Sequence, residues 1–131
     1  MPPAERITRV VRALLGVTAG VLWLVVAFTH GAAIVGGGSM RPVLHSGDIV
    51  VYRRGAQGVA VGDLVVFSHP EWSGGVVHRV IAIARDGSLV TRGDANAAQD
   101  FEPVSRDRVV GIAVVIVPSG KAVALARQAA E

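Results

Sequence analysis

The feature that most constrains this chain is an uncharged run from Ala13 to Val35. Its 23 residues are almost all apolar, and the most polar among them are Thr18, Thr29 and His30. As an α-helix the run would be about 34 Å long, which is enough to cross a hydrocarbon core of about 30 Å. The run therefore predicts a transmembrane helix at residues 13–35, preceded by a short tail of residues 1–12.

Charges on the two sides of this run predict its orientation. Arg6, Arg9 and Arg12 precede it, and no basic residue follows until Arg41. The positive-inside rule then places residues 1–12 in the cytoplasm and residues 36–131 outside it, in a single-pass protein of the plasma membrane. A cleavable signal peptide, cut near residues 31–33, is the alternative interpretation. The run exceeds the usual signal-peptide core in length, which favours a retained anchor, and both interpretations put residues 36–131 on the same side.

Composition excludes two classes of function. Residues 39–131 carry ten basic and nine acidic side chains, so the domain has no concentrated basic surface for nucleic acid. The chain has no cysteine, which rules out a disulfide framework, a thiolate nucleophile and a cysteine-based metal site.

Residues 39–118 have the pattern of a small β domain. Short stretches rich in Val and Ile are separated by Gly/Asp pairs that suit chain reversals, and Asp86-Gly87 marks the clearest hairpin. We expect a mainly β fold with coiled, closed or nearly closed sheets, and a short helix or frayed end at residues 121–131. The predicted strands are Ile49–Tyr52, Leu64–Phe67, Val76–Ala84, Ser88–Thr91 and Val109–Val117.

Residue types narrow the chemistry that this domain could perform. The four histidines lack the spacing of metal ligands, so we expect no metal, and we expect no other cofactor. Lys121 is the only lysine and follows the last predicted strand, so a serine hydrolase built from this chain would need a histidine base. Ser39, after three glycines, and His78, between valines, are the candidates. From the residues alone, such a serine is more often a polar loop residue and such a histidine more often a core residue than a catalytic pair.

Four segments, taken in order, resemble the sequence boxes of the type I signal peptidases. Residues 39–48 match the nucleophile box, Ser-Met-x-Pro followed by Gly-Asp, and residues 62–67 match the next strand box. Residues 78–81, His-Arg-Val-Ile, are similar to the box that carries the base, and residues 93–100 to the final box. Histidine at position 78, where the common bacterial branch has lysine, resembles the archaeal and endoplasmic-reticulum-type branch.

The resemblance implies a fold, a reaction and a set of site residues. It implies a mostly β peptidase domain at residues 36–131 and removal of signal peptides from exported preproteins at the membrane. Cleavage would follow a small residue at position −1, with a small or aliphatic one at −3, as in Ala-x-Ala. Ser39 would be the nucleophile and His78 the general base; Asp100 would orient the base and Asp94 would be a second required carboxylate.

Other functions stay open at this point. An inactive relative would bind exported peptides at the membrane without cutting them. A dedicated processing peptidase would use the same chemistry on a single precursor. A soluble self-cleaving repressor of the related Ser/Lys class is disfavoured by the apolar run and by the missing lysine.

Overall fold

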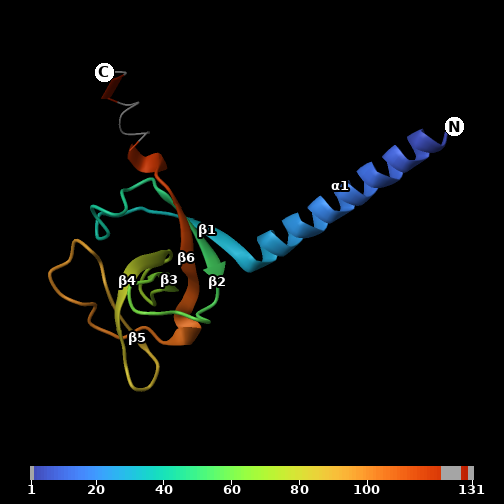
Figure 1. Cartoon of the computed structure of the whole chain (residues 1–131). Coiled ribbons are helices and arrows are strands. Elements are labelled where there is room, and N and C mark those ends of the chain that lie inside the picture. Colours follow the sequence, from blue (N-terminus) through green and yellow to red (C-terminus); the bar gives the residue numbers. More distant parts are fainter. Residues whose placement is uncertain (1, 122–127, 130–131) are drawn as a thin grey trace.

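The computed structural model describes residues 2–121 and 128–129, and it consists of one long helix and one β domain (Figure 1). Helix α1 spans Pro3–Thr29 and extends away from the domain. A short 3₁₀ helix, η1 (Arg106–Arg108), precedes the last strand. The strands are β1 (His30–Ile34), β2 (Ile49–Arg54), β3 (Leu64–Ser68), β4 (Gly75–Ile83), β5 (Leu89–Arg92) and β6 (Val109–Val117).

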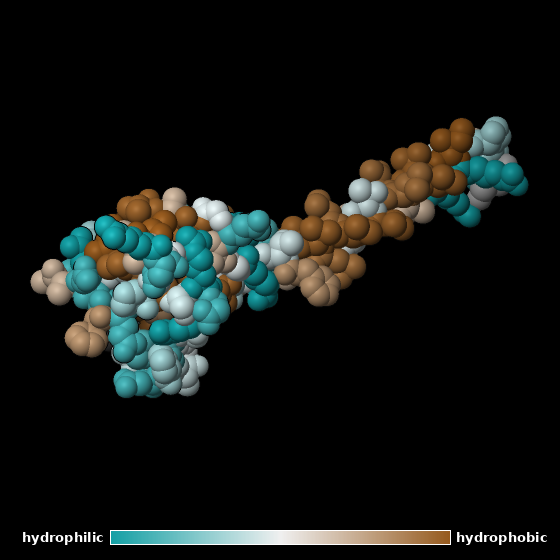
Figure 2. Space-filling model, turned by 90° about the horizontal axis from the view of Figure 1, so that it is seen from below, coloured by the Kyte–Doolittle hydropathy of each residue, from teal (hydrophilic) through white to brown (hydrophobic). Residues whose placement is uncertain are grey.

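Helix α1 has the length and composition of a membrane span. None of its residues is buried against the rest of the chain, and its apolar window has a mean hydropathy of 2.2. Figure 2 shows its surface as hydrophobic along most of its length, with a hydrophilic amino-terminal end. A helix that is apolar all round and packs on nothing in its own chain is typical of a segment that lies in lipid.

The helix does not follow the predicted range of residues 13–35. It begins ten residues earlier, at Pro3, and ends at Thr29, so His30–Ile34 leaves the helix and becomes strand β1. Strand β1 pairs antiparallel with β2, where Gly31 lies opposite Tyr52. A Cβ on Gly31 would lie 2.5 Å from the Tyr52 ring, so a larger residue here would force the ring to move. Residues 30–34 therefore form backbone hydrogen bonds with β2 and do not extend the helix.

The strands form one antiparallel sheet in the order β1-β2-β6-β3-β4-β5. The five strands expected from the sequence are present to within one or two residues at their ends, so the mainly β prediction is confirmed. The sheet is not fully closed, because β1 and β5 are its two edges and do not pair with each other.

Two hydrophobic clusters hold the site in place. Alternate residues of β3 enter different clusters, Val65 and Phe67 one of them and Leu64 and Val66 the other. Both faces of β3 are therefore buried, which explains its continuous apolar sequence. The first cluster also holds the part of β4 that carries His78, and the second holds the loop that carries Ser39. The short helix expected at residues 121–131 lies mostly outside the described residues.

Candidate active site

The structure brings three of the four predicted site residues into one chain of hydrogen bonds. His78 Nε2 lies 3.1 Å from Ser39 Oγ, and His78 Nδ1 lies 2.6 Å from Asp100 Oδ2. His78 is 7% exposed, on the face of β4 that points into the first cluster. The edge of its ring meets Phe67 at a centroid distance of 6.1 Å. Packing and two hydrogen bonds thus fix the imidazole in one orientation.

The hydrogen bonds also determine the tautomer of His78. An ionised carboxylate only accepts hydrogen bonds, so the proton of a neutral imidazole must be on Nδ1, facing Asp100. Nε2 is then unprotonated and accepts the hydroxyl proton of Ser39. This is the arrangement that a serine nucleophile needs from a general base.

Ser39 lies on a loop that is held from two sides. Beneath it the side chain of Met40, 1% exposed, enters the second cluster. Beside it the backbone N–H of Ala95 donates to the carbonyl of Ser39 at 2.8 Å. Gly93 makes this approach possible, because a Cβ there would lie 2.6 Å from the Ser39 carbonyl oxygen. The loop after β5 therefore sets the position of the serine as well as that of the aspartate.

Thr91 is a site residue that the sequence did not reveal. It is fully buried in β5, and its hydroxyl donates to Asp100 Oδ2 at 2.6 Å, the same oxygen that accepts from His78. The backbone of Thr91 also accepts from the N–H of Asp100 at 2.8 Å. A threonine in a strand is so ordinary that no sequence signal could have marked it. Its two bonds hold the Asp100 carboxylate against the imidazole.

Asp94 lies apart from His78 and binds Arg79. Its two oxygens accept from Arg79 Nε at 2.8 Å and from Nη2 at 2.6 Å, a bidentate pair. Arg79 also donates to the carbonyl of Gly62 at 2.8 Å. The hydrogen bonds from Arg79 lower the pKa of Asp94, and the same carboxylate raises the pKa of Arg79. Asp94 thus ties the loop after β5 to strand β4, next to the base.

A second carboxylate fixes the far end of the serine loop. Asp48 is 1% exposed and accepts from the backbone N–H of His45 and from that of Gly120, both at 2.8 Å. The bond from His45, with that from Gly120, lowers the pKa of Asp48 although burial opposes the shift. Ser119 donates to the carbonyl of Gly47 on the same side. The turn after β6 therefore closes over the loop that begins at Ser39.

The arrangement is suited to nucleophilic attack on a carbonyl without a metal ion. In residues 2–121 and 128–129 no three His, Asp or Glu side chains gather as a metal site. A serine hydroxyl, a histidine that accepts its proton and a carboxylate behind the histidine are the elements of acyl transfer.

Comparison with known protein families shows which family the chain belongs to. The sequence model described as "Signal peptidase, peptidase S26" matches residues 7–96, which is more than two thirds of the chain. The chain belongs to this signal peptidase family. The resemblance drawn from the four sequence segments is thereby confirmed. The matched range includes Ser39, His78 and Asp94 and ends before Asp100, so the place of Asp100 is given by the hydrogen bonds alone.

Similar proteins include three from fungi, each named "Signal peptidase complex catalytic subunit SEC11". The one from Eremothecium gossypii is 37% identical over 82 residues, which are 59% of this chain and 49% of that protein. The one from Pyricularia oryzae is 31% identical over 97 residues, 65% and 56% of the two chains. The one from Chaetomium globosum is 33% identical over 78 residues, 56% and 45%. The chain thus spans about half the length of the curated relatives that it matches.

Proposed function

We propose that this protein is a membrane-bound serine endopeptidase that removes signal peptides from exported preproteins after small residues, as in Ala-x-Ala. The observation that carries the proposal is the chain of hydrogen bonds Ser39–His78–Asp100, with distances of 3.1 and 2.6 Å. Membership of the signal peptidase family supports the choice of substrate. The name of the fungal relatives, a catalytic subunit of a signal peptidase complex, supports it as well.

In the proposed reaction Ser39 Oγ attacks the carbonyl carbon of the scissile bond while its proton moves to His78 Nε2. The tetrahedral intermediate collapses, the C–N bond breaks, and Nε2 gives the proton to the leaving amine. Water, deprotonated by His78, then hydrolyses the ester on Ser39 and the serine recovers its proton. Asp100 stabilises the imidazolium, and Asp94 holds the neighbouring loop through Arg79. The backbone N–H of Ser39 donates to the oxyanion, a role commonly worth about 3–4 kcal/mol of barrier.

The proposed topology places α1 across the membrane with residues 1–12 in the cytoplasm. Arg6, Arg9 and Arg12 lie on the first turns of α1, and its remaining residues, 13–29, are uncharged. This asymmetry favours a β domain outside the cytoplasm, where exported preproteins emerge.

The test uses the full chain in detergent or lipid with a preprotein whose apolar core ends in Ala-x-Ala. We expect the wild type to cut after the second alanine and Ser39→Ala and His78→Ala to lose at least about 10⁴-fold in kcat. Ser88→Ala, in the β4–β5 turn, is the matched control and should be unaffected. A folded wild type that binds the preprotein without cutting it would overturn the proposal in favour of the inactive, peptide-binding relative. Cleavage of a single precursor only would instead indicate the dedicated processing peptidase.

A further inference from the structure

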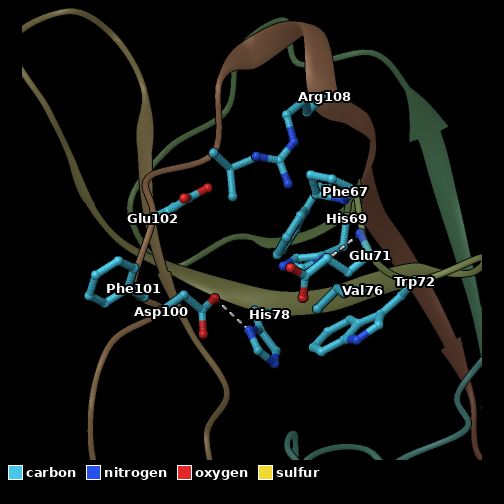
Figure 3. Close-up of a pocket in the computed structure, with 12 residues that line it drawn as sticks. Phe67, His69, Glu71, Trp72, Val76, His78, Asp100, Phe101, Glu102 and Arg108 are labelled. Atoms are coloured by element: carbon cyan, nitrogen blue, oxygen red, sulfur yellow. Dashed lines mark hydrogen bonds and ion pairs between the residues drawn. The ribbon is translucent and has the colours of Figure 1, made fainter.

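A cavity lies beside His78. Its volume is about 390 Å³, and it lies between the β3–β4 loop and residues 100–104. Figure 3 shows His78 at one end and Arg108 at the other, with Trp72 on one wall and Phe101 on the other. Ser39 is not among its lining residues, whereas the His78 ring and the Asp100 carboxylate are.

The position of this cavity follows from the chemistry of the proposed reaction, on which the inference rests. The acyl part of the substrate stays on Ser39, and the departing amine must take its proton from His78 Nε2. The polypeptide that follows the scissile bond therefore has to pass the imidazole. We propose that the cavity binds the first residues on this leaving side, which become the new amino terminus of the exported protein.

The lining predicts which leaving-side residues bind best. The inner surface is apolar, formed by the buried side chains of Phe67, Val76 and Val104. At the mouth, Trp72 is 58% and Phe101 99% exposed, so two aromatic faces are available to a peptide. Such a surface favours an apolar or long aliphatic side chain next to the scissile bond.

Charge at the rim adds a preference for basic over acidic residues. Glu71 and Glu102 line the cavity, and neither carboxylate forms an ion pair with another residue of the described chain. Arg108 is the one guanidinium in the lining and donates through Nε and Nη2 to the carbonyl of Ser68. His69 Nδ1 accepts a hydrogen bond from the N–H of Glu71 at 3.2 Å, which holds this loop at the cavity. Apart from Asp100, which pairs with His78, two carboxylates against one guanidinium leave the rim negative, which suits lysine, arginine and a new α-ammonium group.

The first test measures cleavage by the full chain in detergent. Three preproteins share an Ala-x-Ala site and carry Lys-Lys, Ala-Ala or Glu-Glu directly after it. We expect kcat/KM to fall in that order, by about threefold to tenfold from Lys-Lys to Glu-Glu, as for exposed charge pairs. Glu102→Lys should remove or reverse the order, while Glu5→Lys, the same change at the far end of α1, should keep it. An order unchanged in Glu102→Lys would overturn the cavity assignment and leave the proposed activity standing.

Two further measurements separate the cavity from the catalytic residues. A small fluorophosphonate that reacts with Ser39 has no leaving peptide, so it should label Glu102→Lys and wild type at equal rates. Unequal labelling would mean that the substitution disturbs the site itself, and would overturn the interpretation. In Ser39→Ala, p-benzoylphenylalanine in place of Phe101 should crosslink to leaving-side residues of a bound preprotein. Crosslinks only to residues before the cleavage site would refute the inference, and this readout needs no hydrolysis.

Discussion

The roles of Asp100 and Asp94 can be separated by one pair of isosteric substitutions. Asp100→Asn removes a negative charge 2.6 Å from His78 Nδ1, whereas Asp94→Asn removes one that faces Arg79. During the reaction His78 becomes a positively charged imidazolium. Of the two carboxylates, only that of Asp100 directly stabilises this charge as it develops in the transition state. Asp100→Asn should therefore lower kcat far more than Asp94→Asn does.

The size of the effect follows from the distance. Two unit charges 2.6 Å apart at an effective dielectric constant of about 20 attract by about 6 kcal/mol. The Asp100 side chain is 22% exposed, so solvent screens part of this attraction, and we take about 4 kcal/mol as the loss. That loss corresponds to about 10³-fold in kcat. Asp94→Asn keeps a neutral acceptor for Arg79, and we expect a loss below about tenfold, with about 1–2 kcal/mol lower stability.

The assay compares kcat at saturating preprotein with the midpoint of thermal unfolding for both variants in the same detergent. Asp100→Asn should lose activity with little change in the unfolding midpoint. Asp94→Asn should keep most of its activity and unfold at a lower temperature. The reasoning would be refuted if Asp94→Asn lost more in kcat than Asp100→Asn while both unfolded at the wild-type temperature. In that case Asp94, and not Asp100, would be the carboxylate that acts through His78.

Three further predictions concern the residues around the site. Thr91→Val removes the second donor to Asp100 and should lower kcat about threefold to tenfold, whereas Thr91→Ser, which keeps the hydroxyl, should stay within about twofold in the same cleavage assay. Asp48 and Asp94 have lowered pKa values in the folded state, so each carboxylate stabilises the fold above about pH 4, and this stabilisation is lost as the pH falls through its folded pKa. Chemical unfolding between pH 7 and pH 3 should therefore show a falling free energy of unfolding, with a smaller fall in Asp94→Asn than in the wild type. A chain that starts at His30 keeps all six strands and should still label with fluorophosphonate, and failure to label would show that the domain depends on α1.

The strands, the turns between them and the histidine base could be predicted from the sequence, because the residue types involved have strong local preferences or few alternatives. Val- and Ile-rich stretches between Gly/Asp pairs became β2 to β6, because β-branched side chains and turn glycines have strong local preferences. Gly47, Gly62 and Gly87 do have positive φ angles. The absence of a usable lysine directed attention to His78, and the structure places His78 beside Ser39.

Prediction from the sequence failed where the outcome depended on a partner distant in sequence. Apart from His30, residues 30–34 are small or apolar and carry no formal charge, so they fit a transmembrane pattern as well as an edge strand, and only pairing with β2 decides between the two. Whether the two edge strands meet also depends on residues distant in sequence, and in the structure β1 and β5 do not pair with each other. Asp94 and Asp100 lie in the same loop, and spacing alone could not separate their roles; the choice of Asp100 to orient the base came from the family resemblance, and its hydrogen bond to His78 agrees with that choice.

In the proposed topology, the unexpected strand β1 also determines how the site is joined to the membrane. The uncharged part of α1, residues 13–29, is about 26 Å long, slightly less than a hydrocarbon core of about 30 Å. A span that is slightly short draws its flanking residues toward the lipid, and here those residues are β1, which follows α1 without a linker. Ile34 at the end of β1 is 76% exposed, and Ser39 follows five residues later. Because β1 is hydrogen-bonded to β2 as part of the sheet, the proposed topology has folded structure, and no flexible linker, between the membrane span and Ser39. A signal peptide has its scissile bond just beyond its own apolar core. A nucleophile held rigidly close to the membrane interface would therefore already lie at the depth of that bond.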